Sequence, residues 1–403
     1  MCATAAPSKT GLSDSSTKPA STKKPARADP ASENIAPNNI ASKNAESKNT
    51  ESKNTATAAL TLEQASLPVI DLEGLFTGDE SGVANALGDA ARTSGFFYIT
   101  GHRIEQSLID ALFAASEQFH SMPRAWKMKY WCGFTNNHRG YVPFEENGRN
   151  FPSKINYHEA WDMSYEVAAD HPDYLAGWRM TGPNVWPDLP GWQDTVTAYY
   201  NAVFELGLRI LDALALNLGV EKQELRQHIV NPTSQLRMLR YLENDAPADE
   251  SAVGIDSHSD FEAFTILLQG GPGLQVMNAD DYWVEAPPIP GTFIVNIGDI
   301  FEAWSAGRFK ATQHRVVNTG RARYSFPLFF GLNYHSVVQP LRKFATEETL
   351  KRYPPMVAGE HLMQMSVHGF RYLQDGVDKG TIDLGYEVPA ENPFMREAKP
   401  IDG

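Results

Sequence analysis

Three side chains of the sequence have the types and spacing of a metal site. His258 and Asp260 are separated by one residue, and His314 follows in a later segment. Residues i and i+2 of an extended strand project from the same face, so His258 and Asp260 can converge on one point. Two imidazoles and one carboxylate on one face suit non-haem Fe(II) and leave coordination positions open. The spacing therefore predicts an iron centre, although His258-x-Asp260 taken alone would more simply be a turn or a strand end.

A second pair of polar residues follows His314. Arg323 and Ser325 also share a face if their segment is a strand, and that face is the inner one if this strand pairs with the strand of His314. A guanidinium group binds a carboxylate through two parallel hydrogen bonds, and a nearby hydroxyl adds one more donor. The pair predicts a carboxylate clamp beside the metal, and its presence favours the metal site over a turn.

The segments that must position these side chains are short strands. From residue 235 onward, strand patterns of about four to eight residues recur about every ten residues, separated by turns. They are QLRMLRYL, AFTILLQ, GLQVM, YWVEAP, GTFIVNIG, QHRVVN and RYSFPLFFGLN. Many short, evenly spaced strands favour a mainly β fold with flanking helices, of the jelly-roll kind.

Helical patterns flank these strands. The longest covers residues 192–219 and ends at Gly219, a residue suited to capping a helix. We expect a single folded domain over 61–403, with a helical N-terminal part at 61–230, a jelly-roll core at about 235–340 and a closing helix at about 356–375.

The first 60 residues have a different composition. Ala, Ser, Thr, Lys, Asn and Pro dominate, and ESKNTESKNT at 46–55 is a near-repeat. Such a stretch has too little apolar surface to offset the entropy lost on ordering, so we expect a disordered tail. A transit peptide is the alternative, although no amphipathic, Arg-rich helix is visible.

Charge and cysteine content limit the classes of function. The 403 residues carry a formal net charge of -14, which argues against nucleic-acid or anionic-membrane binding and favours small-molecule chemistry. Only two cysteines are present, too few for a disulfide framework. No segment approaches the length of a membrane helix and no signal-peptide core is visible, so we expect a cytoplasmic protein. The sequence leaves the oligomeric state open.

These motifs, in this order, resemble the iron- and 2-oxoglutarate-dependent oxygenase superfamily, in the branch of isopenicillin N synthase and the plant flavonoid oxygenases. The likeness extends over most of residues 67–375 and includes LPVIDL, SGFFYITGH and PPIPGTFIVNIGDIFEAWSAGRFKATQHRV. It implies a double-stranded β-helix, which is a jelly roll. It also implies an enzyme that uses Fe(II), 2-oxoglutarate as cosubstrate and O2.

The resemblance also implies roles for single residues. His258, Asp260 and His314 would ligate Fe(II). Arg323 and Ser325 would hold the distal carboxylate of 2-oxoglutarate, and Tyr241 matches a tyrosine that commonly touches the same carboxylate in the family. Two weaker candidates face the substrate: Arg237, which shares a strand face with Tyr241 and could hold an acidic group, and Tyr141 in HRGYVP.

The implied reaction is oxidation of a small molecule, such as an amino acid derivative or a secondary metabolite, with release of succinate and CO2. Hydroxylation, desaturation and ring closure differ only in how the substrate is placed, so the sequence does not choose among them. Two alternatives stay open. One is an oxidase of the isopenicillin N synthase type that does not use 2-oxoglutarate, and the other is a catalytically inactive jelly-roll binding protein.

Overall fold

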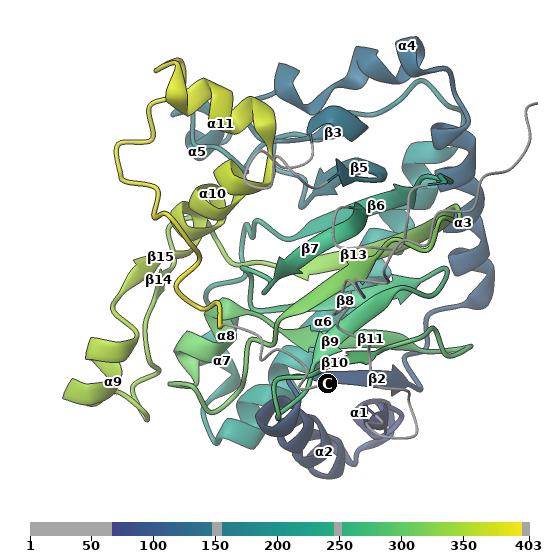
Figure 1. The fold of residues 1–403 in the computed structure, drawn as a ribbon. Helices are drawn as coiled ribbons and strands as arrows, with labels where there is room; N and C mark the ends of the chain where they lie inside the picture. The colour runs from purple at the N-terminus through teal and green to yellow at the C-terminus, as the bar shows by residue number, and fades with distance from the viewer. Residues whose placement is uncertain (1–66, 147–154, 246–251, 397–403) are drawn as a thin grey trace, which may run out of the picture. The chain divides into compact units, whose positions relative to one another are not determined.

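A computed structural model describes residues 67–146, 155–245 and 252–396 (Figure 1). The expected tail at residues 1–60 lies outside these ranges. Within them, no helix is both long enough and apolar enough to cross a membrane.

Two β-sheets form the centre of the described part. The strands of the larger sheet, in spatial order, are β1 (Val69–Asp71), β2 (Phe96–Thr100), β11 (Phe293–Ile297), β8 (Phe264–Gln269), β13 (Arg323–Phe330), β6 (Gln235–Tyr241), β5 (His158–Ser164) and β3 (Gly140–Val142). Those of the smaller sheet are β10 (Trp283–Glu285), β9 (Leu274–Met277), β12 (His314–Val317), β7 (Ala252–His258) and β4 (Ile155–Asn156). A separate pair joins β14 (Val337–Val338) to β15 (Met356–Val357).

The chain alternates between the two sheets. It runs from β6 in the larger sheet to β7 in the smaller, back to β8, across to β9 and β10, back to β11, across to β12 and finally back to β13. This alternation is the double-stranded β-helix that the strand pattern predicted. All seven strand segments expected after residue 235 are present, and β7, β14 and β15 are additional strands that the sequence pattern did not indicate.

Strands from the N-terminal part complete the larger sheet. β5 pairs with β6 along its whole length, from His158 opposite Tyr241 to Ser164 opposite Gln235. β2 pairs with β11 on the other side of the sheet. The largely helical region before residue 230 and the β core are therefore joined through one hydrogen-bonded sheet.

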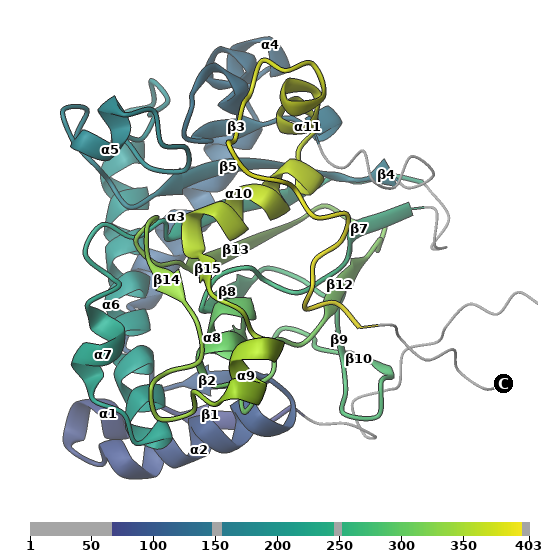
Figure 2. The same cartoon turned by 90° about the vertical axis from the view of Figure 1, so that its left-hand side faces the viewer.

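The helices lie around the sheets (Figures 1 and 2). They are α1 (Gly74–Thr77), α2 (Glu80–Thr93), α3 (Gln106–His120), α4 (Arg124–Lys127), α5 (Pro172–Leu175), α6 (Trp192–Leu218), α7 (Lys222–Arg226), α8 (Asp299–Trp304), α9 (Glu347–Arg352), α10 (Ala358–Gly369) and α11 (Arg371–Asp378). Short 3-10 turns cover Met128–Tyr130, Cys132–Phe134 and Phe144–Glu146. The closing helix expected at about 356–375 is divided in two, because the chain is extended at Phe370.

The main apolar core lies between the helices and the larger sheet. Leu87 of α2, Leu112 of α3 and Ile210 of α6 are buried in one cluster with Phe264 and Phe330 of the sheet. A second cluster lies between the two sheets. The larger sheet is therefore packed on both faces, which explains why its central strands are nearly continuous apolar runs.

Candidate active site

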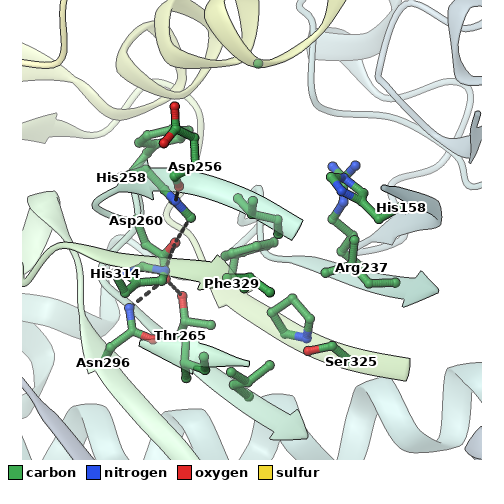
Figure 3. Close-up of a pocket in the computed structure, with 18 of the residues that line it drawn as sticks. His158, Arg237, Asp256, His258, Asp260, Thr265, Asn296, His314, Ser325 and Phe329 are labelled. Atoms are coloured by element: carbon green, nitrogen blue, oxygen red, sulfur yellow. Dashed lines mark hydrogen bonds and ion pairs between the residues drawn. The ribbon is translucent and has the colours of Figure 1, made fainter. Parts of the chain in front are cut away.

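A cavity of about 300 Å³ lies between the two sheets. Its walls come from β6, β8 and β13 of the larger sheet, from β7 and β12 of the smaller sheet, and from residues 365–370 at the end of α10. Figure 3 shows His258, Asp260 and His314 on one side, with Arg237 and His158 on the other. The space between the inner faces of the two sheets of a jelly roll is a common place for a small ligand to bind.

The three predicted metal ligands meet in this cavity. His258 is the last residue of β7 and pairs across the sheet with His314, the first residue of β12. The Nε2 atoms of His258 and His314 lie 3.7 Å and 3.5 Å from Oδ1 of Asp260. One ligand atom from each of the three residues lies within 4.8 Å of the others.

The backbone brings His258 and Asp260 together differently from the sequence prediction. We expected both to share the face of a regular strand that leads into the AFTILLQ segment. Instead β7 ends at His258, and Asp260 lies in the loop between β7 and β8. The amide of Asp299 at the start of α8 donates to the carbonyl oxygen of Asp260 at 2.9 Å, so the loop rather than a strand fixes the carboxylate.

Hydrogen bonds orient all three side chains toward a common point. Nδ1 of His258 lies 2.7 Å from the carbonyl oxygen of Asp256, and Nδ1 of His314 lies 3.3 Å from that of Thr312. Since a carbonyl only accepts, Nδ1 carries the proton in each ring and Nε2 presents its lone pair.

The carboxylate of Asp260 is held in the same way. Its Oδ2 accepts a hydrogen bond from Nδ2 of Asn296 at 2.6 Å and another from the hydroxyl of Thr265. Oδ1 is left facing the two imidazoles. This donor set, two imidazole nitrogens and one oriented carboxylate oxygen, fits Fe(II).

The surroundings of Asp260 and His314 shift the pKa values of both groups in directions that favour cation binding. Burial of Asp260 opposes its charge, but His314, His258 and the hydrogen bonds to Oδ2 outweigh burial and hold the pKa of this carboxyl below its ordinary value. Burial, reinforced by His258, lowers the pKa of the His314 imidazole. The carboxylate is therefore ionised and the His314 imidazole neutral near pH 7, which are the forms that bind a metal ion.

The predicted carboxylate clamp lies on neighbouring strands of the larger sheet. Arg323 pairs with Tyr241, and Ser325 pairs with Leu239, in the antiparallel contact of β13 with β6. The guanidinium carbon of Arg323 lies 3.8 Å from the centre of the Tyr241 ring. Tyr241, Arg323 and Ser325 all line the cavity.

One nitrogen of the Arg323 side chain is buried without a partner. Nη1 donates weakly to the carbonyl oxygen of Gly271 at 3.4 Å, whereas Nη2 makes no hydrogen bond to any of the described residues. Burial lowers the pKa of this guanidinium, and Tyr241 offsets part of that effect. A buried cation with an unused donor is costly unless a ligand supplies the acceptor, so the site fits a carboxylate such as the distal one of 2-oxoglutarate.

The two weaker candidates have different outcomes. Arg237 lines the cavity, as its shared face with Tyr241 predicted. Tyr141 does not line it: β3 is the outermost strand of the larger sheet, and the Tyr141 hydroxyl donates to Oε2 of Glu159. Glu159 is also paired with Lys127 at 2.6 Å, in a buried polar cluster outside the cavity wall. The expectation that Tyr141 faces the substrate is therefore corrected.

Several residues of the site were not identified from the sequence. Asn296 and Thr265, which orient Asp260, each interrupt an apolar strand pattern with a buried polar side chain, and that interruption could have indicated them. His158 and Phe370 also line the cavity. Neither stands in a pattern that distinguishes it from an ordinary structural residue.

Comparisons with known proteins agree with this geometry. Residues 67–189 match the family described as non-haem dioxygenase in morphine synthesis N-terminal, and residues 233–332 match the 2OG-Fe(II) oxygenase superfamily. The chain is 32% identical over 300 residues to a 2-oxoglutarate-Fe(II) type oxidoreductase, hxnY, of Emericella nidulans, covering 72% of this chain and 86% of that protein. It is 32% identical over 324 residues to homoarginine-6-hydroxylase 2-ODD-233 of Oryza sativa subsp. japonica, and this match covers 76% of this chain and 98% of that protein.

Solved structures share the fold. A 2OG-Fe(II) oxygenase family protein of Caulobacter crescentus superposes with a TM-score of 0.66 at 28% identity, covering 75% of this chain and 98% of that one. A full-length Neurospora crassa protein in complex with alpha-KG and thymine superposes with a TM-score of 0.64 at 25% identity. The superposition covers 74% of this chain and 96% of that chain.

These relatives support the 2-oxoglutarate-dependent enzyme rather than the oxidase or the inactive binding protein. The predicted fold class and enzyme class are confirmed. The chain therefore belongs to the 2OG-Fe(II) oxygenase superfamily, and it is a non-haem iron enzyme that uses Fe(II), 2-oxoglutarate and O2 to oxidise a small molecule.

Proposed function

We propose that His258, Asp260 and His314 bind the iron, and that Arg323 and Ser325 hold the distal carboxylate of 2-oxoglutarate with Tyr241 beside it. One observation carries this assignment: three ligand atoms within 4.8 Å of one another share a cavity with the buried, unpartnered Nη2 of Arg323. A structural histidine–aspartate cluster would not require an unsatisfied guanidinium in the same cavity.

The residues of the chain bind, orient and shield the reactants. Bound Fe(II) with 2-oxoglutarate and O2 supplies the oxidising chemistry. Asn296 and Thr265 fix Oδ2 of Asp260, so that Oδ1 is directed to the metal position. The Tyr241 ring supports the flat face of the Arg323 guanidinium, which keeps its donors in one plane for a carboxylate. Apolar side chains such as Leu239, Leu267 and Phe329 line part of the cavity and offer water no hydrogen-bond partner there.

The substrate is proposed to be an amino acid derivative or a secondary metabolite, contacted by Arg237. A cavity of about 300 Å³ suits a compact molecule. Two relatives, a homoarginine hydroxylase and a protein solved in complex with thymine, act on or bind small molecules of this size, which supports the proposal. Hydroxylation, desaturation and ring closure are all within this chemistry.

We also propose that residues 61–403 form one oxygenase domain. A cytoplasmic location is proposed as well, because a reducing compartment keeps iron in the Fe(II) state. Binding of nucleic acid or of a membrane surface is not part of the proposal, since the net charge of -14 opposes both.

An anaerobic titration tests the assignment. Adding Fe(II) and then 2-oxoglutarate to the protein should produce the visible charge-transfer band of the iron–keto acid chelate. His314→Ala should abolish this band. His335→Ala is the matched control, because this exposed histidine lies outside the cavity and its loss should leave the band unchanged. No band in the unmodified protein, or an unchanged band in His314→Ala, would contradict the proposal.

A further inference from the structure

We infer from the structure that the substrate carries an anionic group, a carboxylate in the simplest case, which Arg237 binds on the wall opposite the metal ligands. The inference rests on the proposed function and adds to it the chemical class of the substrate. In Figure 3, Arg237 and His158 lie across the cavity from His258, Asp260 and His314.

Arg237 is held in place from behind by a buried carboxylate. Its Nη1 lies 3.3 Å from Oδ2 of Asp162, and this is its one ion pair among the described residues. The side chain of Asp162 is 0% exposed, and the same Oδ2 also lies 3.0 Å from Nε2 of His138. The carboxylate is thus sealed behind the guanidinium, and a molecule in the cavity meets the donors of Arg237 rather than the acceptor of Asp162.

The C-terminal helices fix the plane of this guanidinium. Phe370, in the break between α10 and α11, lies with its ring centre 5.0 Å from the guanidinium carbon of Arg237. The same ring packs against His138 at 4.2 Å. His138 in turn lies parallel to the Tyr372 ring and 2.6 Å from its hydroxyl oxygen. A guanidinium fixed on one face and at one edge is preorganised for planar recognition of a carboxylate.

The position of Arg237 is distinct from the cosubstrate clamp. Arg237, Leu239 and Tyr241 project from β6 into the cavity, and Arg323 pairs with Tyr241 at the far end of this run. Four residues of extended strand separate the Cα atoms of Arg237 and Tyr241 by about 13 Å. One carboxylate cannot occupy both positions, so Arg237 remains available while 2-oxoglutarate occupies the clamp.

The surrounding wall favours an anion with a compact apolar body. Burial lowers the pKa of His158 to about 3, and the charges of Arg237 and Arg323 contribute to this shift, so the imidazole stays neutral beside the guanidinium. A cationic substrate group would be repelled from the same wall. Leu239 lies between Arg237 and Tyr241 on β6 and lines the cavity there with an apolar side chain, and Phe329 lines it beyond Arg237.

The test compares acids with their uncharged amides. Benzoate and benzamide, and phenylacetate and phenylacetamide, are titrated anaerobically into the enzyme saturated with Fe(II) and 2-oxoglutarate, and binding is followed by calorimetry and by the change in the charge-transfer band. Each acid should bind at least about ten-fold more tightly than its amide, because a charge-assisted hydrogen bond to Arg237 is available only to the acid.

Two variants test whether Arg237 causes the preference for acids over amides. The double variant Arg237→Gln/Asp162→Asn should lose the preference for acids while retaining the affinity for 2-oxoglutarate, and it avoids leaving a lone buried carboxylate. Arg240→Gln is the matched control, because Arg240 is also on β6 but pairs with Glu159 outside the cavity. Its preference for acids should be unchanged.

The outcomes separate this inference from the function on which it rests. Without a charge-transfer band in the unmodified enzyme, the proposed function falls and the inference falls with it. With the band present, the inference alone is overturned if acids and amides bind equally, if no acid binds, or if the preference survives in the double variant.

Discussion

Exchanging Arg323 for glutamine should separate cosubstrate binding from stability. In the free protein this guanidinium is buried, its Nη2 has no acceptor among the described residues, and its Nη1 makes one long contact with Gly271. Its removal relieves the cost of burying an unsatisfied cation and loses its contact with the Tyr241 ring. These effects oppose each other, so we expect the free energy of unfolding to change by about 1 kcal/mol or less.

The affinity for 2-oxoglutarate should respond much more strongly. A carboxylate at the clamp would receive up to two charge-assisted hydrogen bonds from Arg323, each contributing about 1.5–3 kcal/mol. The hydroxyl of Ser325 remains in the variant, and glutamine can still donate one neutral hydrogen bond. A net loss of about 3 kcal/mol is therefore expected, which corresponds to a roughly 100-fold weaker Kd.

The same exchange at Arg237 should have the opposite effect. Arg237→Gln leaves Asp162, whose side chain is 0% exposed, without its cationic partner. His138 also contacts this carboxylate, but burial lowers the pKa of His138, so its imidazole stays neutral. Breaking a buried ion pair on one side costs about 3–5 kcal/mol. The affinity for 2-oxoglutarate should change little, and Arg237→Gln/Asp162→Asn should recover most of the lost stability.

Two measurements test these predictions for Arg323→Gln and Arg237→Gln. Urea unfolding of the metal-free proteins gives the stability of each variant, and anaerobic titration of the Fe(II) forms with 2-oxoglutarate gives its Kd. The reasoning is refuted if Arg323→Gln destabilises the protein more than Arg237→Gln does, or if Arg323→Gln binds 2-oxoglutarate as tightly as the unmodified enzyme.

Three further substitutions test other parts of the structure. Asn296→Ala should weaken Fe(II) binding about 10- to 100-fold in a competition titration with a chelator, because Oδ2 of Asp260 loses a hydrogen bond at 2.6 Å; unchanged metal affinity would count against this. Gly207→Ala should destabilise the fold by about 1–3 kcal/mol in urea, because the added Cβ would lie 2.5 Å from the buried ring of Phe330; an unaltered midpoint would show that helix α6 can shift. Lys127→Met should cost about 1.5–3 kcal/mol, because Glu159 on β5 loses a charged hydrogen-bond donor at 2.6 Å but keeps its contacts with Arg240 and the Tyr141 hydroxyl; a second change of Glu159 to glutamine should restore part of the loss.

The sequence was sufficient to predict the enzyme family, the residues that meet at the proposed metal site and most of the strands. His258-x-Asp260, His314 and Arg323-x-Ser325 are recognisable because coordination and carboxylate binding require particular side chains at short spacings. The strand segments after residue 235 are recognisable because a packed strand leaves an apolar pattern within a few residues. Both patterns are formed by residues close together in the chain, so they can be recognised before the fold is known.

Other features depend on which segments become neighbours. The loop position of Asp260 is fixed by Asn296 and by the start of α8, and neither is near Asp260 in the chain. The prediction for Tyr141 failed for the same kind of reason, since an aromatic residue in a short strand does not indicate on which face of the sheet it will pack.

The wall around Arg237 is the clearest example of what only the tertiary structure decided. His138 and Tyr372 are 234 positions apart, yet their side chains meet behind Phe370. The periodicity of a strand states which residues share a face, but not which distant residues lie opposite that face. The sequence by itself therefore determined the metal chemistry, whereas the three-dimensional packing of β5, β6 and the C-terminal helices determined what the metal's substrate will meet.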